Sequence, residues 1–189
     1  MHAALDERIY TTDDLLRMPD GDRYELIHGR LMEREMGAEA TSIAARIIGF
    51  LWMFLEENAI GVVLTSEARY VCFPKDPNHS RRPDASVVLF SRLAGNRLPK
   101  GDMHIRPDLA VEVVSPNDGA EDLAVKVAEY QSVGVPLIWV VYPTTRRVLI
   151  HRLPSSPLGP VTELTETATI SGEDVLPGFT CPVAKFFGR

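Results

Sequence analysis

Asp108-Leu-Ala-Val-Glu-Val-Val-Ser115 is an apolar run interrupted by a single acid. Apolar residues at both the odd and the even positions of such a run are typical of a central strand that is covered on both faces of the sheet. Glu112 breaks the run, and a bare carboxylate in that place costs several kcal/mol unless a cation, a proton or hydrogen-bond donors compensate it. The sequence therefore predicts a central strand over 108–114 and a compensating group beside Glu112.

A second acid, Asp84, ends Arg82-Pro-Asp84 and precedes another apolar stretch, Ala85-Ser-Val-Val-Leu-Phe90. If the two strands are neighbours, Asp84 and Glu112 emerge at one point. Paired carboxylates can hold a divalent cation, and Mg²⁺ usually takes only one or two of them from the protein. The alternative is structural: Asp84 caps a turn after proline, and Glu112 pairs with an arginine.

Length and composition indicate one ordinary globular domain. The chain has 189 residues, 45% of them apolar and 24% charged, which is enough for a single core. Cys72 and Cys181 give neither a disulfide framework nor metal-ligand spacing, so a reducing, cytoplasmic setting is expected. The amino terminus lacks a basic segment before an apolar core, and no window approaches the roughly 18 apolar residues of a membrane span. We expect a protein that is neither secreted nor membrane-embedded, with a loose terminus over residues 1–8.

The net charge of −6 argues against non-specific coating of nucleic acid, which depends on neutralising phosphates with lysine and arginine. Six cations nevertheless fall close together around the two candidate strands. They are Arg81, Arg82, Arg92, Arg97, Lys100 and Arg106. They can line a local basic cleft or lie on a solvated loop face, and the second arrangement is the more common.

The first half of the chain predicts two helices, a hairpin and further strands. Thr11 or Thr12 can cap the short first helix, which Pro19 stops, and Gly29 suits a tight hairpin turn. The expected elements are helices over 12–18 and 38–58, hairpin strands over 24–27 and 30–33, strands over 62–65, 68–73 and 85–90, and a long polar connection over 91–107.

Three polar side chains in this half have two interpretations each. Glu25 in the hairpin can be a third acid of the site, although exposed strand glutamates are common. Glu39, near the start of the long helix, can be a ligand, although the helix dipole alone favours an acid there. His79 can bind a metal, but a lone histidine in a polar loop is more often merely solvated.

The second half predicts a strand, a helix and a strand in succession, which indicates a parallel pair joined by a right-handed crossover. The expected elements are the strand over 108–114, a helix over 120–133 that Asn117 or Asp118 caps and Gly134 closes, strands over 137–142 and 147–153, Thr-rich strand signals at 161–170, and a short closing segment over 179–187 docked at the edge.

Lys126 occupies a position on that helix that periodicity would give to an apolar residue. A lysine that points from a helix toward a carboxylate-bearing strand can hold a phosphate, or a water near a metal. The alternative is an ion pair on the helix itself, with Asp122 or Glu129.

Taken together, several stretches resemble one known pattern. They are Tyr24-Glu-Leu-Ile27, Arg82-Pro-Asp84, Asp108-Leu-Ala-Val-Glu-Val-Val-Ser-Pro116, Asp122-Leu with Lys126, Tyr130 and Gly134-Val135, and Ile138-Trp-Val-Val141 with Pro143. The combination covers about residues 10–180 and is similar to the Uma-type restriction endonuclease family, a branch of the PD-(D/E)xK nuclease superfamily.

The resemblance implies an α/β (α+β) fold, with a restriction-endonuclease-like mixed β-sheet flanked by helices in one domain over residues 1–189. It implies a metal-dependent endonuclease that hydrolyses DNA phosphodiester bonds. Asp84 and Glu112 would hold Mg²⁺ or Mn²⁺, with the Val113 carbonyl as a further ligand and Glu25 as an auxiliary acid. Many nucleases cut two strands with two subunits, so a homodimer is suggested by analogy.

The sequence also departs from the family pattern. The superfamily's lysine, two residues after the second acid, is replaced by Val114, and Lys126 is the candidate substitute. His28 and Arg30 stand where family members commonly carry acids, and the long helix begins Glu39-Ala40-Thr41 where a histidine often stands. The alternative function is therefore a catalytically weak or inactive nuclease-fold module that binds nucleic acid or protein.

Overall fold

A computed structural model describes residues 8–33, 36–116, 119–153 and 160–188. Its centre is a six-stranded mixed sheet in the order β3-β4-β5-β6-β7-β8. The strands are β3 (Gly61–Thr65), β4 (Ala85–Leu89), β5 (Leu109–Val113), β6 (Leu137–Tyr142), β7 (Arg147–Arg152) and β8 (Val161–Thr165). Among these strands only β5 and β6 pair in parallel, and helix α3 (Ala120–Ser132) joins them. The predicted parallel pair joined by a helix is confirmed.

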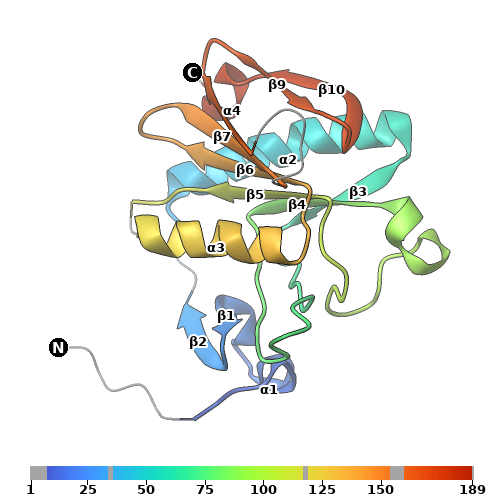
Figure 1. The fold of residues 1–189 in the computed structure, drawn as a ribbon, viewed down its shortest axis with the longest axis vertical. Helices are drawn as coiled ribbons and strands as arrows, with labels where there is room; N and C mark the ends of the chain where they lie inside the picture. The colour runs from blue at the N-terminus through green and yellow to red at the C-terminus, as the bar shows by residue number, and fades with distance from the viewer. Residues whose placement is uncertain (1–7, 34–35, 117–118, 154–159, 189) are drawn as a thin grey trace.

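Helices cover both faces of the sheet, as Figure 1 shows. Helix α3 lies on one face. The long helix α2 (Ala38–Asn58) lies on the other, with the hairpin β9 (Thr169–Gly172) and β10 (Leu176–Pro182) and the short helix α4 (Ala184–Phe187). Because strand side chains alternate between faces, Val111 and Val113 join the α2 core while Ala110 joins the α3 core. Glu112 is two positions after Ala110 on β5, so its side chain points to the same face, toward α3.

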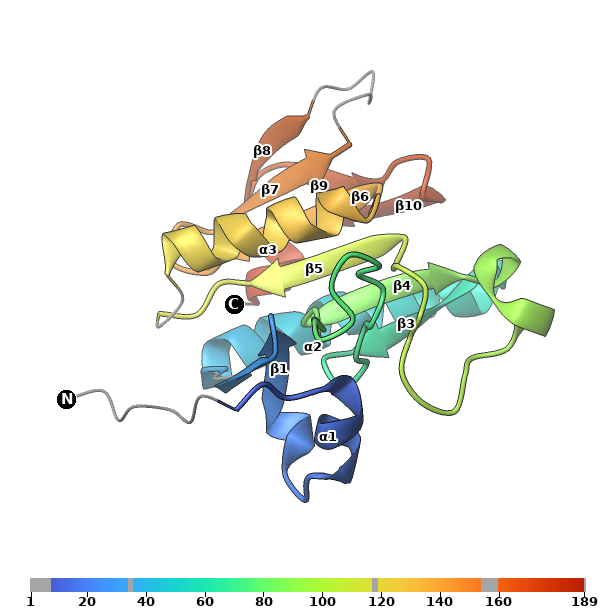
Figure 2. The same cartoon turned by 60° about the horizontal axis from the view of Figure 1, so that its bottom comes forward.

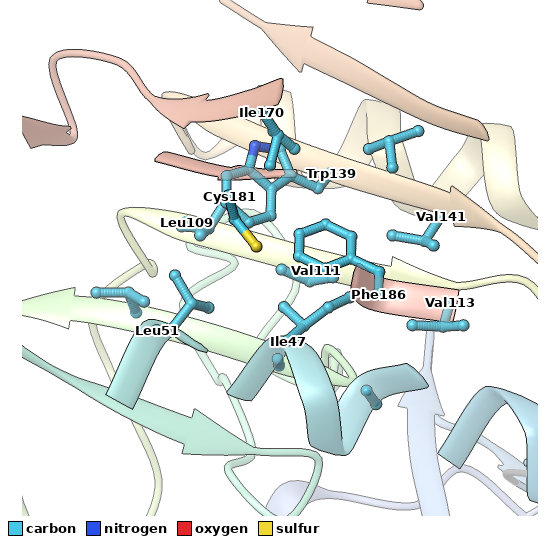
Figure 3. Close-up of a cluster of buried hydrophobic side chains, with 14 of the residues drawn as sticks. Ile47, Leu51, Leu109, Val111, Val113, Trp139, Val141, Ile170, Cys181 and Phe186 are labelled. Atoms are coloured by element: carbon cyan, nitrogen blue, oxygen red, sulfur yellow. The ribbon is translucent and has the colours of Figure 1, made fainter. Parts of the chain in front are cut away.

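The larger core lies between α2, the sheet and the carboxyl-terminal elements (Figure 3). Trp139 on β6 and Phe186 on α4 are both fully buried, and their ring centroids are 6.2 Å apart. The closing segment therefore contributes to the core, and the expectation that it docks at an edge is wrong. The physical reason is that the β9–β10 hairpin and α4 lie on the α2 face of the sheet, where Phe179 and Val183 are buried in the same core as Phe186.

The amino-terminal elements lie together beside one end of the sheet (Figure 2). Helix α1 (Thr12–Arg17) begins with a capping box formed by Thr11 and Asp14. The hairpin β1 (Tyr24–Ile27) and β2 (Arg30–Glu33) has a two-residue turn in which His28 and Gly29 both have positive φ, at 50° and 77°. This is the turn geometry that the right-handed strand twist favours, and the predicted hairpin is confirmed.

Two strand expectations need correction. Residues 68–73 form no regular strand: Tyr70 makes single bridges to Arg81 and Met103, which belong to loop segments rather than to a neighbouring strand. The Thr-rich stretch at 161–170 divides between β8 and β9, which belong to different sheets. The expected cap residues Asn117 and Asp118 lie outside the described residues.

Helix α2 is long and apolar enough to cross a membrane by length and composition, with a mean hydropathy of 1.4 over its best window. Core helices meet the same criterion. Ile43, Ile47, Leu51 and Leu55 on its inner face are buried in the core beneath the sheet. In this fold α2 therefore serves as a core helix.

Candidate active site

Asp84 and Glu112 lie at the ends of neighbouring strands. The antiparallel pairing of β4 with β5 ends at Ala85 opposite Val111, so the two acids occupy the next position on each strand. Asp84 is 8% exposed and Glu112 is 4% exposed. Oδ2 of Asp84 accepts a hydrogen bond of 2.7 Å from the backbone N–H of Val113. This bond takes the place of a backbone hydrogen bond at the point where β4 and β5 separate, and it fixes the Asp84 carboxylate beside β5.

Helix α3 supplies the compensating groups for Glu112. The hydroxyl of Tyr130 donates to Oε1 of Glu112 at 2.6 Å, and Nζ of Lys126 donates to Oε2 at 3.3 Å. Within the described residues the ion pairs of Lys126 are with Glu112 and Glu25, not with Asp122 or Glu129. The neighbouring Glu112 carboxylate raises the pKa of Lys126 more than burial lowers it, so the ammonium group is charged at neutral pH.

Glu25 reaches the same place from β1, although it is remote in sequence. It is 4% exposed, so the alternative of an exposed strand glutamate is wrong. Its Oε2 accepts from Arg81 Nη1 at 2.9 Å and its Oε1 accepts from the backbone N–H of Arg82 at 2.8 Å. Lys126 Nζ lies 3.9 Å from Oε2. Burial raises the pKa of Glu25, but the charges of Lys126 and Arg81 outweigh it and the net shift is downward.

The six cations near the two acids do not form one surface. Arg81 and Arg82 are each 6% exposed, so the expectation of a solvated loop face is wrong for both. Arg81 also donates from Nε to Glu129 Oε2 at 2.6 Å, which connects β1 to α3. Arg92 and Arg106 pair instead with Asp108, and Arg97 and Lys100 are exposed.

A cleft of about 320 Å³ opens over these groups. Its polar lining includes Glu25, Arg81, Asp84, Glu112, Ser115 and Lys126. Val113 also lines it, but Glu39 does not: it is exposed at the start of α2. Carboxylate oxygens are the ligands that hard divalent cations prefer, and an adjacent ammonium can bind a phosphate oxygen. The cleft therefore combines groups that suit a metal ion and a phosphodiester.

Sequence reasoning missed several residues near this cleft. The sequence does not predict that Arg81 pairs with Glu25 and Glu129, and His79 is 2% exposed, so the solvated alternative for His79 is wrong. Their positions depend on how loop 74–80 folds onto α3, a long-range contact that no local pattern reports. The single available signal was the density of charge in Arg81-Arg82-Pro-Asp84.

Comparisons with known proteins address the fold and the family of the chain. A solved structure described as "a putative nuclease belonging to DUF820" from Anabaena variabilis matches with a TM-score of 0.76 and 20% identity, over 94% of this chain and 97% of that chain. At that identity the likeness shows the fold. No curated protein matches. A family model described as "Uma2: Putative restriction endonuclease" matches residues 12–184. The chain therefore belongs to the Uma2 family.

Proposed function

We propose that this protein is a metal-dependent endonuclease that hydrolyses phosphodiester bonds in DNA. Membership of the Uma2 family supports a nuclease. The observation that carries the proposal is that Asp84, Glu112 and Lys126 line one cleft, with Lys126 Nζ 3.3 Å from Glu112 Oε2. Lys126 would take the role of the superfamily lysine, whose position here is Val114. Buried carboxylates beside a lysine are costly as a purely structural device, whereas a phosphodiesterase needs them.

The residues present fit a divalent cation. Glu25, Asp84 and Glu112 are all buried and line one cleft. Lys126 pairs with both Glu25 and Glu112, and Arg81 divides its bonds between Glu25 and Glu129. Asp84 and Glu112 would hold Mg²⁺ or Mn²⁺, with the Val113 carbonyl as a further ligand, since carboxylate oxygens that already accept one hydrogen bond retain lone pairs. A bound divalent cation polarises the scissile phosphate and lowers the pKa of a coordinated water.

The chain's own residues would then position the reacting groups. Lys126, held as a cation by Glu112, would donate hydrogen bonds to the attacking water or to a phosphate oxygen and offset developing negative charge. Tyr130 occupies one oxygen of Glu112 and so fixes the orientation of that carboxylate. Glu25, as an auxiliary acid, keeps Lys126 in the cleft through its charge.

The second candidate is a nuclease-fold module that binds nucleic acid or protein without cleavage. The net charge of −6 and the valine at position 114 favour it. It makes no use of the compensated acid cluster, which is why we place it second. A cytoplasmic location, expected from the cysteine content, and a homodimer, suggested by analogy with nucleases that cut two strands, are further parts of the proposal.

The test is cleavage of supercoiled plasmid and of single-stranded DNA by the purified protein with Mg²⁺ or Mn²⁺. We expect cutting that requires the metal and that Asp84→Asn and Glu112→Gln abolish. Glu121→Gln is the matched control, because Glu121 is an exposed acid on α3 outside the cleft. Cutting that survives both cleft variants would refute the site.

Calorimetric titration with Mn²⁺ separates the two candidate functions. Binding that Asp84→Asn removes is expected for the nuclease, even if the correct DNA target has not been supplied. A wild-type protein that neither binds Mn²⁺ nor cuts DNA would leave the non-catalytic module as the function.

A further inference from the structure

Three side chains from three separate segments converge outside the acid cleft. His28 lies in the turn of the β1–β2 hairpin, His79 in the loop before Ser80, and Glu129 on α3. One candidate ligand atom from each lies within 4.8 Å of the others. They line a cavity of about 190 Å³ together with Phe73 and Asp76. The hairpin, the loop and the helix therefore meet at a cluster of polar side chains.

His79 is the unusual member of this cluster. Its side chain is 2% exposed, with the edge of Phe73 against its ring at a centroid distance of 4.4 Å. Nε2 lies 3.2 Å from Glu129 Oε2, yet neither ring nitrogen makes a well-oriented hydrogen bond within the described residues. A buried polar group without such a bond is costly. An additional partner at this point would remove that cost.

Asp76 orients the second histidine. Its Oδ2 lies 2.5 Å from Nδ1 of His28, and its Oδ1 accepts from the backbone N–H of Asn78 at 3.0 Å. A carboxylate on one imidazole nitrogen selects the tautomer whose other nitrogen carries a lone pair. The lone pair of His28 Nε2 is thereby available to bind a metal ion. Asp76 and His28 thus resemble the carboxylate–histidine pairs that bind many metal ions in proteins.

We propose that His28, His79 and Glu129 bind a transition-metal cation of the Zn²⁺ type, with Asp76 as the group that orients His28. Two imidazoles and one carboxylate leave a fourth position open, as in many zinc sites. Mg²⁺ prefers oxygen ligands alone, so this site and the acid cleft select different metals.

The site requires only a local adjustment. Ligand atoms of a tetrahedral zinc ion, at about 2.0–2.1 Å from the metal, are about 3.3 Å apart, and the spacing of up to 4.8 Å must contract. The His28 side chain is 71% exposed and that of its partner Asp76 is 27% exposed, and both line the same cavity, so the pair can shift together toward His79. His79 and Glu129 are already 3.2 Å apart.

A metal ion bound by His28, His79 and Glu129 would also affect the acid cleft. Oε2 of Glu129, which faces His79, is the same oxygen that accepts from Arg81 Nε. Arg81 holds Glu25 through its other end. A metal that draws on Glu129 would weaken its bond to Arg81 and so alter the position of Glu25.

The test measures metal binding by the full chain, prepared without a histidine tag, stripped with a chelator and exchanged into chelator-free buffer. Zn²⁺ is titrated calorimetrically, and Co²⁺ is added as a probe because its visible absorption reports four-coordinate geometry. We expect one equivalent of Zn²⁺ and a four-coordinate Co²⁺ spectrum. His28→Gln is expected to weaken Zn²⁺ binding more than tenfold, and Asp76→Asn by about 10–100-fold.

Two control variants test whether Zn²⁺ binding depends on this cluster. His104→Gln changes an exposed histidine outside the cluster and should leave Zn²⁺ affinity unchanged. Asp84→Asn should leave it unchanged too, so that this site can fail or succeed independently of the proposed nuclease. His28 is the residue to change, because its side chain is 71% exposed and lies outside the hydrophobic core. Absence of Zn²⁺ binding, or binding that is indifferent to His28→Gln, would overturn the proposal.

Discussion

Nζ of Lys126 on helix α3 lies 3.3 Å from Oε2 of Glu112 on strand β5. The superfamily's lysine is expected on the strand itself, but here that position is Val114, and the positive charge comes from the helix that crosses the same face of the sheet. Glu112 raises the pKa of Lys126, so the group stays protonated at neutral pH. It can therefore donate hydrogen bonds and stabilise charge, but it cannot act as the base.

Replacing this lysine should affect catalysis more than metal binding. Lys126→Met removes the cation that offsets charge in the transition state, and we expect kcat to fall by about 10²–10³-fold. Mn²⁺ affinity should be maintained or increased, because a competing cation has been removed from the carboxylates. Lys100→Met, at an exposed position, is the control. A variant with normal kcat would show that Lys126 only compensates buried charge.

Arg81 should be essential for stability. It is 6% exposed and donates to both Glu25 and Glu129, so Arg81→Met removes a charged partner from two acids at once. Loss of one partner from a buried ion pair costs about 3–5 kcal/mol. Urea denaturation followed by circular dichroism measures the change in the free energy of unfolding. Because part of the cost is the uncompensated acid, adding Glu129→Gln should restore some of the stability, and an unrelieved double variant would contradict this account.

Trp139 offers a comparison within the core. It is fully buried, and its Nε1–H has no hydrogen-bond partner within the described residues. Trp139→Phe keeps aromatic packing and removes that donor, so we expect a loss below about 1.5 kcal/mol. Trp139→Ala leaves a cavity and should cost about 3–5 kcal/mol. Equal losses for the two variants, measured by chemical denaturation, would mean that the indole N–H is satisfied in solution.

The first helix should contribute a pH-dependent increment to stability. The backbone N–H and hydroxyl of Thr11 both bond to Asp14 and lower its pKa below the ordinary value of 3.8. A carboxyl whose pKa is lower in the folded state stabilises the fold above its unfolded pKa and loses that contribution as the pH falls through the folded pKa. The difference in unfolding midpoint between wild type and Asp14→Asn should therefore be present at neutral pH and shrink below about pH 3.8. A difference that persists unchanged in acid would exclude ionisation of Asp14 as its cause.

The sequence by itself determined the elements with strong periodicity. The doubly buried strand around Glu112 and the amphipathic helices α2 and α3 follow from apolar spacing. The parallel pair β5–β6 follows from the succession of strand, helix and strand with short connections. The weakly patterned segments were harder to predict. Residues 68–73 have strand-like composition but only single bridges, and α4 is four residues long, too short for a periodic signal.

The tertiary structure alone decided which charges meet. A local pattern can show that Glu112 needs a partner, and helix periodicity placed Lys126 on the right face. It cannot show that the hairpin residue Glu25 lies beside Lys126, that Arg81 joins Glu25 to Glu129, or that His79 is buried beside His28. These contacts span about fifty to a hundred positions, and they arise because the amino-terminal hairpin and loop 74–80 fold against α3. Burial then makes each contact strong, since an acid or imidazole removed from water must find its partner within the protein.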